Sequence, residues 1–174
     1  DTLSVPGQSD AVSFRGESRR RSVYRELRLP LKSSSRTSRE AFMNRLATQN
    51  DYDRTDVQRE PLLSWEEVHS LNDHPLVTIG EHTESHLLLT QQSWKTAWNE
   101  LRSSKERLEQ ELGQPVQHVS YPYGGSNIVV RQMARWMGFE YGFTTQARRT
   151  DRITIWNRLA LPRTDINELV PGND

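Results

Sequence analysis

The sequence predicts an α/β fold in which outer helices cover a parallel sheet or a (β/α) barrel. From Pro61 onward, short apolar runs typical of buried strands alternate with longer segments of helical periodicity. The strand-like runs are Val77–Ile79, Val116–Tyr121, the alternating Phe139–Phe143 and Ile153–Leu161. In folds of this class, functional side chains lie in the loops that follow the carboxyl ends of the strands.

Three helices are predicted in the same part of the chain. The first begins at a capping box, because Ser64 stands three residues before Glu67. The second is long and amphipathic; Thr90 is its predicted N-cap, and Gly113 follows its last turn. The third runs from Ile128 to Met137, just before a glycine.

The chain divides into two predicted parts, residues 1–60 and residues 61–174. Residues 1–60 are polar and are predicted to be a partly disordered segment or insertion with one short helix between Phe42 and Leu46. The basic run Arg19–Arg21 has no interleaved aromatic residues, so a solvated segment is favoured over a nucleic-acid patch. Residues 61–174 are the predicted α/β domain, which we expect to be incomplete.

Composition excludes several classes of function. The 174 residues suffice for one domain with a buried core, and 23 lysines and arginines balance 23 aspartates and glutamates. This balance predicts no nucleic-acid partner. Without cysteine, disulfides and cysteine-ligated zinc are excluded, and no apolar run approaches the roughly 20 residues of a membrane span. The chain begins at Asp1 with no visible signal peptide, so cytoplasm and cell envelope both stay open as localisations.

Two histidines directly follow the Val77–Ile79 run. His82 and His86 are four residues apart, which places both imidazoles on one side of a helical turn, within reach of one divalent ion at about 2.0–2.1 Å. On spacing alone, a surface or core role is an equally good interpretation. Zincin patterns need glutamate where this chain has Thr83 or Ser85, and the deaminase pattern needs cysteines that the chain lacks.

The histidine segment and its surroundings resemble the polysaccharide deacetylase family, carbohydrate esterase family four. The resemblance lies in IGEHTESH, in the helix SWKTAWNELRSSKERLEQELGQPV and in HVSYPYGG, and it covers roughly residues 62–163. The family's histidine motif implies that His82 and His86 bind a divalent metal, with zinc expected and cobalt or nickel as alternatives. It also implies that Thr83 steadies the loop by hydrogen bonding.

The family's second motif matches Pro122, Tyr123 and Gly124. The resemblance implies that the backbone N–H of Tyr123 is an oxyanion donor and that Pro122 and Gly124 border the substrate. The implied fold is a (β/α) barrel of the deacetylase type. The implied activity is hydrolysis of N-acetyl groups on amino sugars of a polysaccharide or oligosaccharide, a reaction at carbon–nitrogen bonds other than peptide bonds. The metal would polarise the amide carbonyl and acidify water.

The chain departs from the family pattern in three places. The family's adjacent aspartates, one a base and one a metal ligand, have no match, because Asp51 and Asp53 lie in a polar stretch. Ser120 stands where an arginine often opens the second motif, and no histidine follows His118 to act as general acid. Arg163, near the end of the resemblance, is expected to border the site.

These departures lead to three expectations. The chain is expected to be the C-terminal part of a deacetylase domain, with the first strands upstream, or else a truncated product. Its activity is expected to be impaired because the aspartate pair is absent, and neither Glu81 nor Glu84 is expected to face the ion and replace it. An exposed sheet edge could support self-association.

A non-catalytic carbohydrate-binding or scaffolding relative is the rival interpretation. Five tryptophans could furnish surfaces on which sugars stack. Trp94 and Trp98 lie on the apolar stripe of the long helix and are predicted to pack in the core, whereas Trp65, Trp136 and Trp156 stay undecided.

Overall fold

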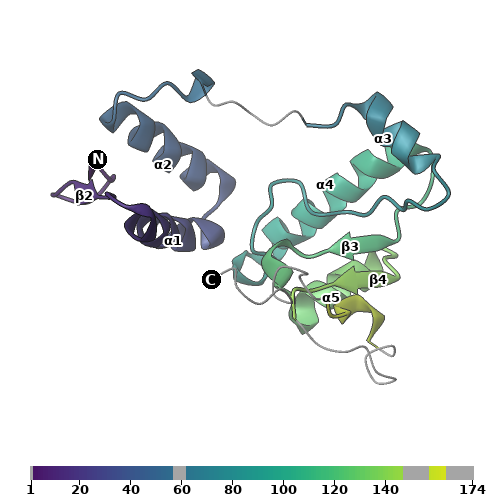
Figure 1. Cartoon of the computed structure of the whole chain (residues 1–174). Coiled ribbons are helices and arrows are strands. Elements are labelled where there is room, and N and C mark those ends of the chain that lie inside the picture. The colour runs from purple at the N-terminus through teal and green to yellow at the C-terminus, as the bar shows by residue number, and fades with distance from the viewer. Residues whose placement is uncertain (1, 57–61, 147–156, 164–174) are drawn as a thin grey trace. The chain divides into compact units, whose positions relative to one another are not determined.

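The structure, a computed structural model, describes residues 2–56, 62–146 and 157–163 (Figure 1). The chain forms two compact units, Asp1–Leu62 and Leu63–Asp174. The first is drawn from purple to blue in Figure 1, and the second from teal to yellow. Among the described residues, no helix is long and apolar enough to cross a membrane.

The first unit is a short antiparallel ribbon followed by a pair of helices. Its elements are β1 (Thr2–Leu3), β2 (Val12–Ser13), α1 (Glu17–Ser33), α2 (Arg36–Gln49) and the 3-10 turn η1 (Arg54–Asp56). Where the sequence predicted one short helix, the structure has two. The basic run lies in α1, where Arg21 pairs with Glu17 one turn earlier and Arg19 pairs with Glu26. Ser35 begins α2, because its hydroxyl accepts the Ser38 N–H.

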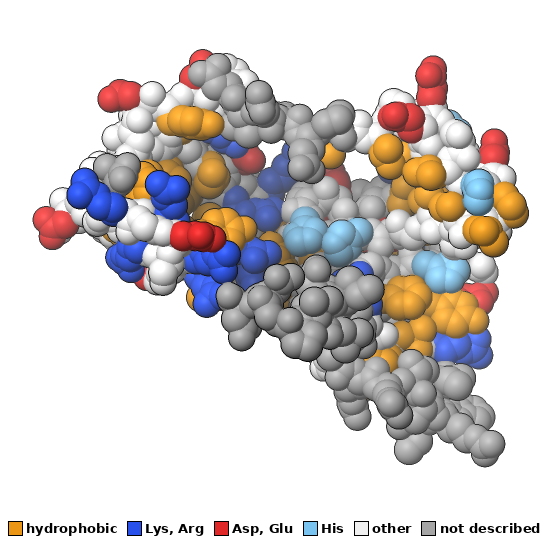
Figure 2. All heavy atoms as spheres, viewed as in Figure 1, with side chains coloured by type: hydrophobic (Ala, Val, Ile, Leu, Met, Phe, Trp, Pro, Cys, Tyr) orange, Lys and Arg blue, Asp and Glu red, His pale blue; other side chains and the backbone are white. Residues whose placement is uncertain are grey.

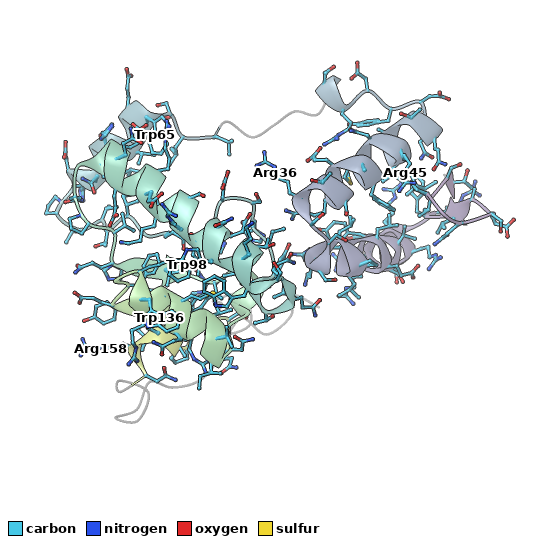
Figure 3. All side chains as sticks on the ribbon, turned by 180° about the vertical axis from the view of Figure 1, so that it is seen from behind. Arg36, Arg45, Trp65, Trp98, Trp136 and Arg158 are labelled. Atoms are coloured by element: carbon cyan, nitrogen blue, oxygen red, sulfur yellow. The ribbon has the colours of Figure 1, made fainter. Side chains whose placement is uncertain are left out.

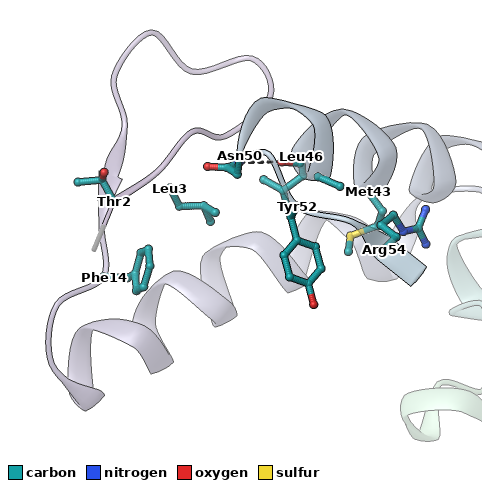
Figure 4. Close-up of a pocket in the computed structure, with 9 residues that line it drawn as sticks. Thr2, Leu3, Phe14, Met43, Leu46, Asn50, Tyr52 and Arg54 are labelled. Atoms are coloured by element: carbon teal, nitrogen blue, oxygen red, sulfur yellow. Dashed lines mark hydrogen bonds between the residues drawn. The ribbon is translucent and has the colours of Figure 1, made fainter. Parts of the chain in front are cut away.

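An apolar pocket of about 580 Å³ lies in this unit (Figure 4). Asn50 lines it and joins the end of α2 to the residue after β1, since its side chain both accepts from Ser4 N and donates to Ser4 O at 2.8 Å. Among the residues that line the pocket are Leu3, Phe14, Met43, Leu46, Tyr52 and Arg54.

The second unit contains a small parallel sheet and its covering helices. Its elements are α3 (Trp65–Asn72), η2 (Leu89–Gln91), α4 (Trp94–Leu112), β3 (His118–Ser120), η3 (Pro122–Gly124), α5 (Ile128–Trp136), β4 (Tyr141–Phe143) and η4 (Arg158–Ala160). Strands β3 and β4 pair in parallel. Parallel bridges extend this pair on both sides, from Glu81 to Val119 and from Phe143 to Leu161. The described sheet does not close, so the partial barrel stays a prediction.

Two predicted strands are shorter than expected. The run Val77–Ile79 is not a strand, because Val77 N–H still donates to His74 O in a turn, and the chain reaches β3 only at Glu81. Within Ile153–Leu161, residues 153–156 lie outside the described residues. The rest forms the turn η4 followed by a single bridge at Leu161.

Capping residues mark where helices α3 and α4 begin or end. The predicted capping box of α3 is confirmed, with both the Ser64 and the Glu67 hydrogen bonds present. The predicted N-cap of α4 is wrong, because Thr90 lies in the separate turn η2 and the Ser93 hydroxyl accepts the Thr96 N–H at 3.1 Å. Gly113 ends α4 in the left-handed conformation at φ 65°, as predicted.

The core of this unit lies between α4, α5 and one face of the sheet. Val119 of β3 is fully buried, and so are Leu101 of α4 and Ala134 of α5. Tyr121 is also fully buried and its hydroxyl donates to Leu159 O at 3.0 Å. The other face of β3 is half-buried and carries His118 and Ser120.

The tryptophans divide between core and surface. Trp98 packs against the core as predicted. Trp94 does not, since 54% of it is exposed and its ring stacks on Trp98 at 5.2 Å. Trp136 of α5 is 64% exposed and lies 6.5 Å from Trp98 (Figure 3). Trp65 is 38% exposed, and Trp156 lies outside the described residues.

Candidate functional site

His82 and His86 lie in an exposed loop at the carboxyl end of the first sheet segment. The loop begins directly after Glu81, where the chain bridges to β3. The two imidazole rings meet edge to face with their centroids 4.8 Å apart. Histidine side chains are visible at the surface in Figure 2. The structure therefore brings the pair together and leaves it accessible to solvent.

One hydrogen bond determines which nitrogen of His82 is available. His82 Nδ1 is bonded to the backbone carbonyl oxygen of Ser120, in the neighbouring strand β3. A carbonyl oxygen only accepts, so Nδ1 carries a proton, and in the neutral imidazole Nε2 then keeps its lone pair. A histidine held by a backbone carbonyl in this way is typical of metal ligands in proteins.

Thr83 holds the loop by the kind of hydrogen bond that the family resemblance implied. Its hydroxyl accepts the backbone N–H of His86 at 3.1 Å. Thr83 and His86 both have left-handed backbones, at φ 63° and 53°. Residues other than glycine adopt this conformation at a cost, so local hydrogen bonds are needed to hold it.

The second motif lies beside the histidines. The ring of Tyr123 meets the His86 ring edge to face at 4.7 Å. Pro122 is buried at the start of η3, so it shapes the loop from inside. Gly124 has φ 68°, and a Cβ on it would lie 2.4 Å from the backbone nitrogen of Thr145. The motif therefore requires glycine at this position. The roles of Pro122, Tyr123 and Gly124 toward substrate stay predictions.

Glu81 is buried, whereas both histidines are exposed. The side chain is fully buried, its Oε1 accepts the Thr83 N–H, and its Oε2 has no hydrogen-bond partner among the described residues. Burial raises the pKa of this carboxyl to about 8, opposed by the Thr83 N–H and the Ser104 hydroxyl. Glu81 thus holds the loop through its hydrogen bond with the Thr83 N–H.

No carboxylate completes the histidine pair within the residues that the structure describes. No group of three histidine, cysteine, aspartate or glutamate side chains suited to a metal occurs there. Asp51 and Asp53 belong to the first unit. Two imidazoles therefore fit a divalent ion in kind but fall one ligand short of the usual three. Arg163 borders the site, since its guanidinium donates to the Ser120 hydroxyl at 3.3 Å.

Sequence reasoning missed Glu100. It is buried in α4, and its carboxylate accepts the backbone N–H of Ser85 in the histidine loop at 2.8 Å. A carboxylate three residues after Ala97 and one before Leu101, on the apolar stripe of the helix, was the signal that could have identified it.

A histidine pair in the loop after one segment of a parallel sheet, with a Pro-Tyr-Gly turn beside it, defines a candidate hydrolase centre. The chain belongs to the polysaccharide deacetylase family, whose sequence profile matches residues 39–142. The match begins at residue 39, whereas the resemblance recognised in the sequence begins at about residue 62. No curated protein matches the chain significantly.

Several solved structures share the fold. The Streptococcus pyogenes deacetylase PplD in complex with acetate is 20% identical, with a TM-score of 0.56 over 71% of this chain and 57% of that one. A polysaccharide deacetylase from Bacillus cereus is 22% identical, with a TM-score of 0.54 over 72% and 43%. IcaB from Ammonifex degensii is 18% identical, with a TM-score of 0.51 over 71% and 60%. The chain thus spans about half the length of these proteins.

Proposed function

We propose that this chain carries the histidine half of a metal-dependent hydrolase site that removes N-acetyl groups from amino sugars of a polysaccharide. The observation that carries the proposal is the paired orientation of His82 and His86. Their rings lie 4.8 Å apart, and the Ser120 carbonyl holds His82 with Nε2 available. Family membership supports the reaction type. The PplD structure contains acetate, which is the product that deacetylation releases.

Each residue of the candidate site has a distinct proposed role. His82 and His86 would hold the ion, with zinc expected first and cobalt or nickel as alternatives. When bound, a divalent ion supplies Lewis-acid chemistry at the amide carbonyl and at water. The backbone N–H of Tyr123 would stabilise the negative charge that develops on the carbonyl oxygen. Thr83 keeps the loop in shape, and Gly124 lets the second motif lie against the Thr145 backbone.

Zinc titration followed by NMR tests the metal site. The imidazole signals of His82 and His86 are expected to shift together, and those of His69 to stay unchanged, because His69 lies in α3 outside the loop. His82→Ala should remove the high-affinity site, whereas His69→Ala should leave it intact. Unchanged zinc affinity in His82→Ala would show that the ion binds elsewhere.

We further propose that this chain alone is a poor deacetylase. Only two ligands are present among the described residues, and the aspartate pair that would supply the third ligand and the base has no match in the sequence. Losing a positioned base costs roughly 10²–10⁴ in rate. The test is acetate release from an acetylated amino-sugar oligomer with zinc or cobalt present, compared with a longer version that carries the aspartate pair. Equal turnover by both would refute the proposal.

A further inference from the structure

The backbone of the histidine loop is held by an unusually complete set of hydrogen bonds. Four consecutive N–H groups, those of Thr83, Glu84, Ser85 and His86, each donate to a defined acceptor. Two of these acceptors are local in sequence, the carboxyl of Glu81 just before the loop and the hydroxyl of Thr83 within it. The other two both belong to Glu100.

Glu100 accepts from the loop with its backbone and with its side chain. Its carbonyl oxygen accepts the Glu84 N–H at 3.3 Å, and its carboxylate Oε2 accepts the Ser85 N–H at 2.8 Å. This is a long-range connection, because Glu100 lies in the second turn of α4 and Ser85 lies 15 residues earlier. The helix therefore determines the path of the loop between the two histidines.

Glu100 is buried, and the contacts of its carboxylate that are present among the described residues lead to the histidine loop. The residue is 8% exposed, and no described lysine or arginine forms an ion pair with it. A carboxylate buried without a counter-cation is costly unless strong hydrogen bonds compensate it. A backbone N–H bound to a carboxylate is a charge-assisted hydrogen bond of this kind.

The loop needs this support because its backbone is strained on both sides of Ser85. Thr83 and His86 have positive φ values of 63° and 53°. Such conformations persist only where surrounding contacts hold them. Loss of the Ser85 acceptor would remove one of the four hydrogen bonds that hold the segment between the histidines, whose rings lie 4.8 Å apart.

We propose that Glu100 is a positioning residue of the candidate metal centre, whose carboxylate fixes the loop conformation that aligns His82 with His86. The role of Glu100 toward a metal rests on the proposed function. Its role in holding the loop conformation does not depend on that function. Glu100 touches neither substrate nor ion; it acts through Ser85 and Glu84.

The test compares three variants of the full chain. Glu100→Leu has an apolar side chain of similar size but cannot accept a hydrogen bond, so a core-packing role would leave it folded and functional. Glu100→Gln keeps an acceptor oxygen for Ser85 N–H. Glu106→Ala is the control, because Glu106 lies on the exposed face of the same helix, where it pairs with Arg102. Zinc affinity is measured by competition with a chromophoric chelator, alongside thermal unfolding.

Glu100→Leu is expected to bind zinc about 10–100-fold more weakly while its melting temperature holds, the range typical for residues that orient metal ligands. Glu100→Gln should recover most of the affinity, and Glu106→Ala should match the wild type. Zinc affinity of Glu100→Leu within about twofold of the wild type would overturn the proposal.

A second measurement separates this proposal from the proposed function. If the wild type binds no zinc, the proposed function fails, and the positioning role is then judged on the metal-free protein. There, Glu100→Leu should shift the NMR signals of both histidine rings and accelerate hydrogen exchange at the Ser85 amide, whereas Glu106→Ala should do neither. If Glu100→Leu does not fold, Glu100→Ala, which also lacks a side-chain acceptor for the Ser85 N–H, carries the same readouts, and unaltered ring signals and Ser85 exchange in it would count against the proposal.

Discussion

Gly124 and Gly113 have nearly the same left-handed backbone, at φ 68° and 65°, but different surroundings. A Cβ at Gly113 would meet nothing within 4 Å, whereas one at Gly124 would lie 2.4 Å from Thr145 N. We expect Gly113→Ala to cost about 1–2 kcal/mol of unfolding free energy, from backbone strain alone. Gly124→Ala should cost about 3 kcal/mol or more, because overpacking adds to the strain. Urea denaturation measures both, and equal losses would show that the Thr145 contact is not a constraint.

Glu81 is expected to make stability depend on pH. Burial raises its pKa from the ordinary value of 4.5 to about 8 in the folded protein. Between these two values, the folded state keeps a proton that the unfolded chain releases, so the free energy of unfolding decreases as pH rises through this window. Denaturation from about pH 5 to about pH 8 should show this decrease.

Glu81→Gln should be less sensitive over the same range, because the neutral amide carries no ionisation. Glu66→Gln, at an exposed position in the first turn of α3, is the control and should retain the slope of the wild type. A slope that survives in Glu81→Gln would assign the effect to another group.

At this scale, the sequence predicts local partners better than distant ones. The spacing of His82 and His86, and Thr83 between them, are visible within five residues. The acceptor of His82 Nδ1 lies 38 residues away in β3, and the acceptor of Ser85 N–H lies 15 residues away in α4. Neither partner has a local pattern that points to it, because the fold brings them together.

At the scale of elements, capping chemistry predicted boundaries well where one candidate residue was present. The capping box of α3 and the glycine that ends α4 are both confirmed. The start of α4 was predicted at Thr90, but a second hydroxyl residue, Ser93, lies three positions later in the sequence. The structure assigns them to consecutive elements: Thr90 lies in η2, and Ser93 caps α4.

Ser93→Ala is therefore expected to destabilise the second unit by about 1 kcal/mol, the usual cost of losing a side-chain N-cap. The lost hydrogen bond is the one from Thr96 N–H at 3.1 Å. Thr90→Ala is the matched control and should cost less, because no hydrogen bond from α4 reaches its hydroxyl among the described residues. Chemical denaturation of both variants compares their losses of unfolding free energy. A larger loss in Thr90→Ala would indicate that Thr90 is the N-cap, as the sequence predicted.

At the scale of the whole molecule, the alternation of strands and helices predicted the parallel sheet. It did not predict the first unit, because the apolar positions of α1 and α2 are sparse and the segment is polar overall. It also overestimated both outer segments of the sheet. Each of these has a described neighbour on one side and pairs through a single bridge, at Glu81 and at Leu161.

The segment before Glu81 forms no strand, and within the described residues its backbone is unpaired and continues the open edge of the sheet at Glu81. None of the backbone hydrogen bonds of the described residues involves Thr78, Ile79 or Gly80. Open edges of this kind present unpaired N–H and C=O groups to other chains, and a lysine on the edge blocks such pairing. We propose that the chain self-associates through this edge.

Sedimentation velocity over a wide range of protein concentrations should therefore show association of the wild type that increases with concentration. Thr78→Lys should reduce it, since Thr78 is exposed in the middle of the edge. Gln110→Lys is the control, because it adds the same charge at an exposed position of α4 and leaves the edge unchanged. Equal association of the two lysine variants would mean that net charge, and not edge pairing, governs the assembly. A wild type that stays monomeric throughout would remove the edge from consideration.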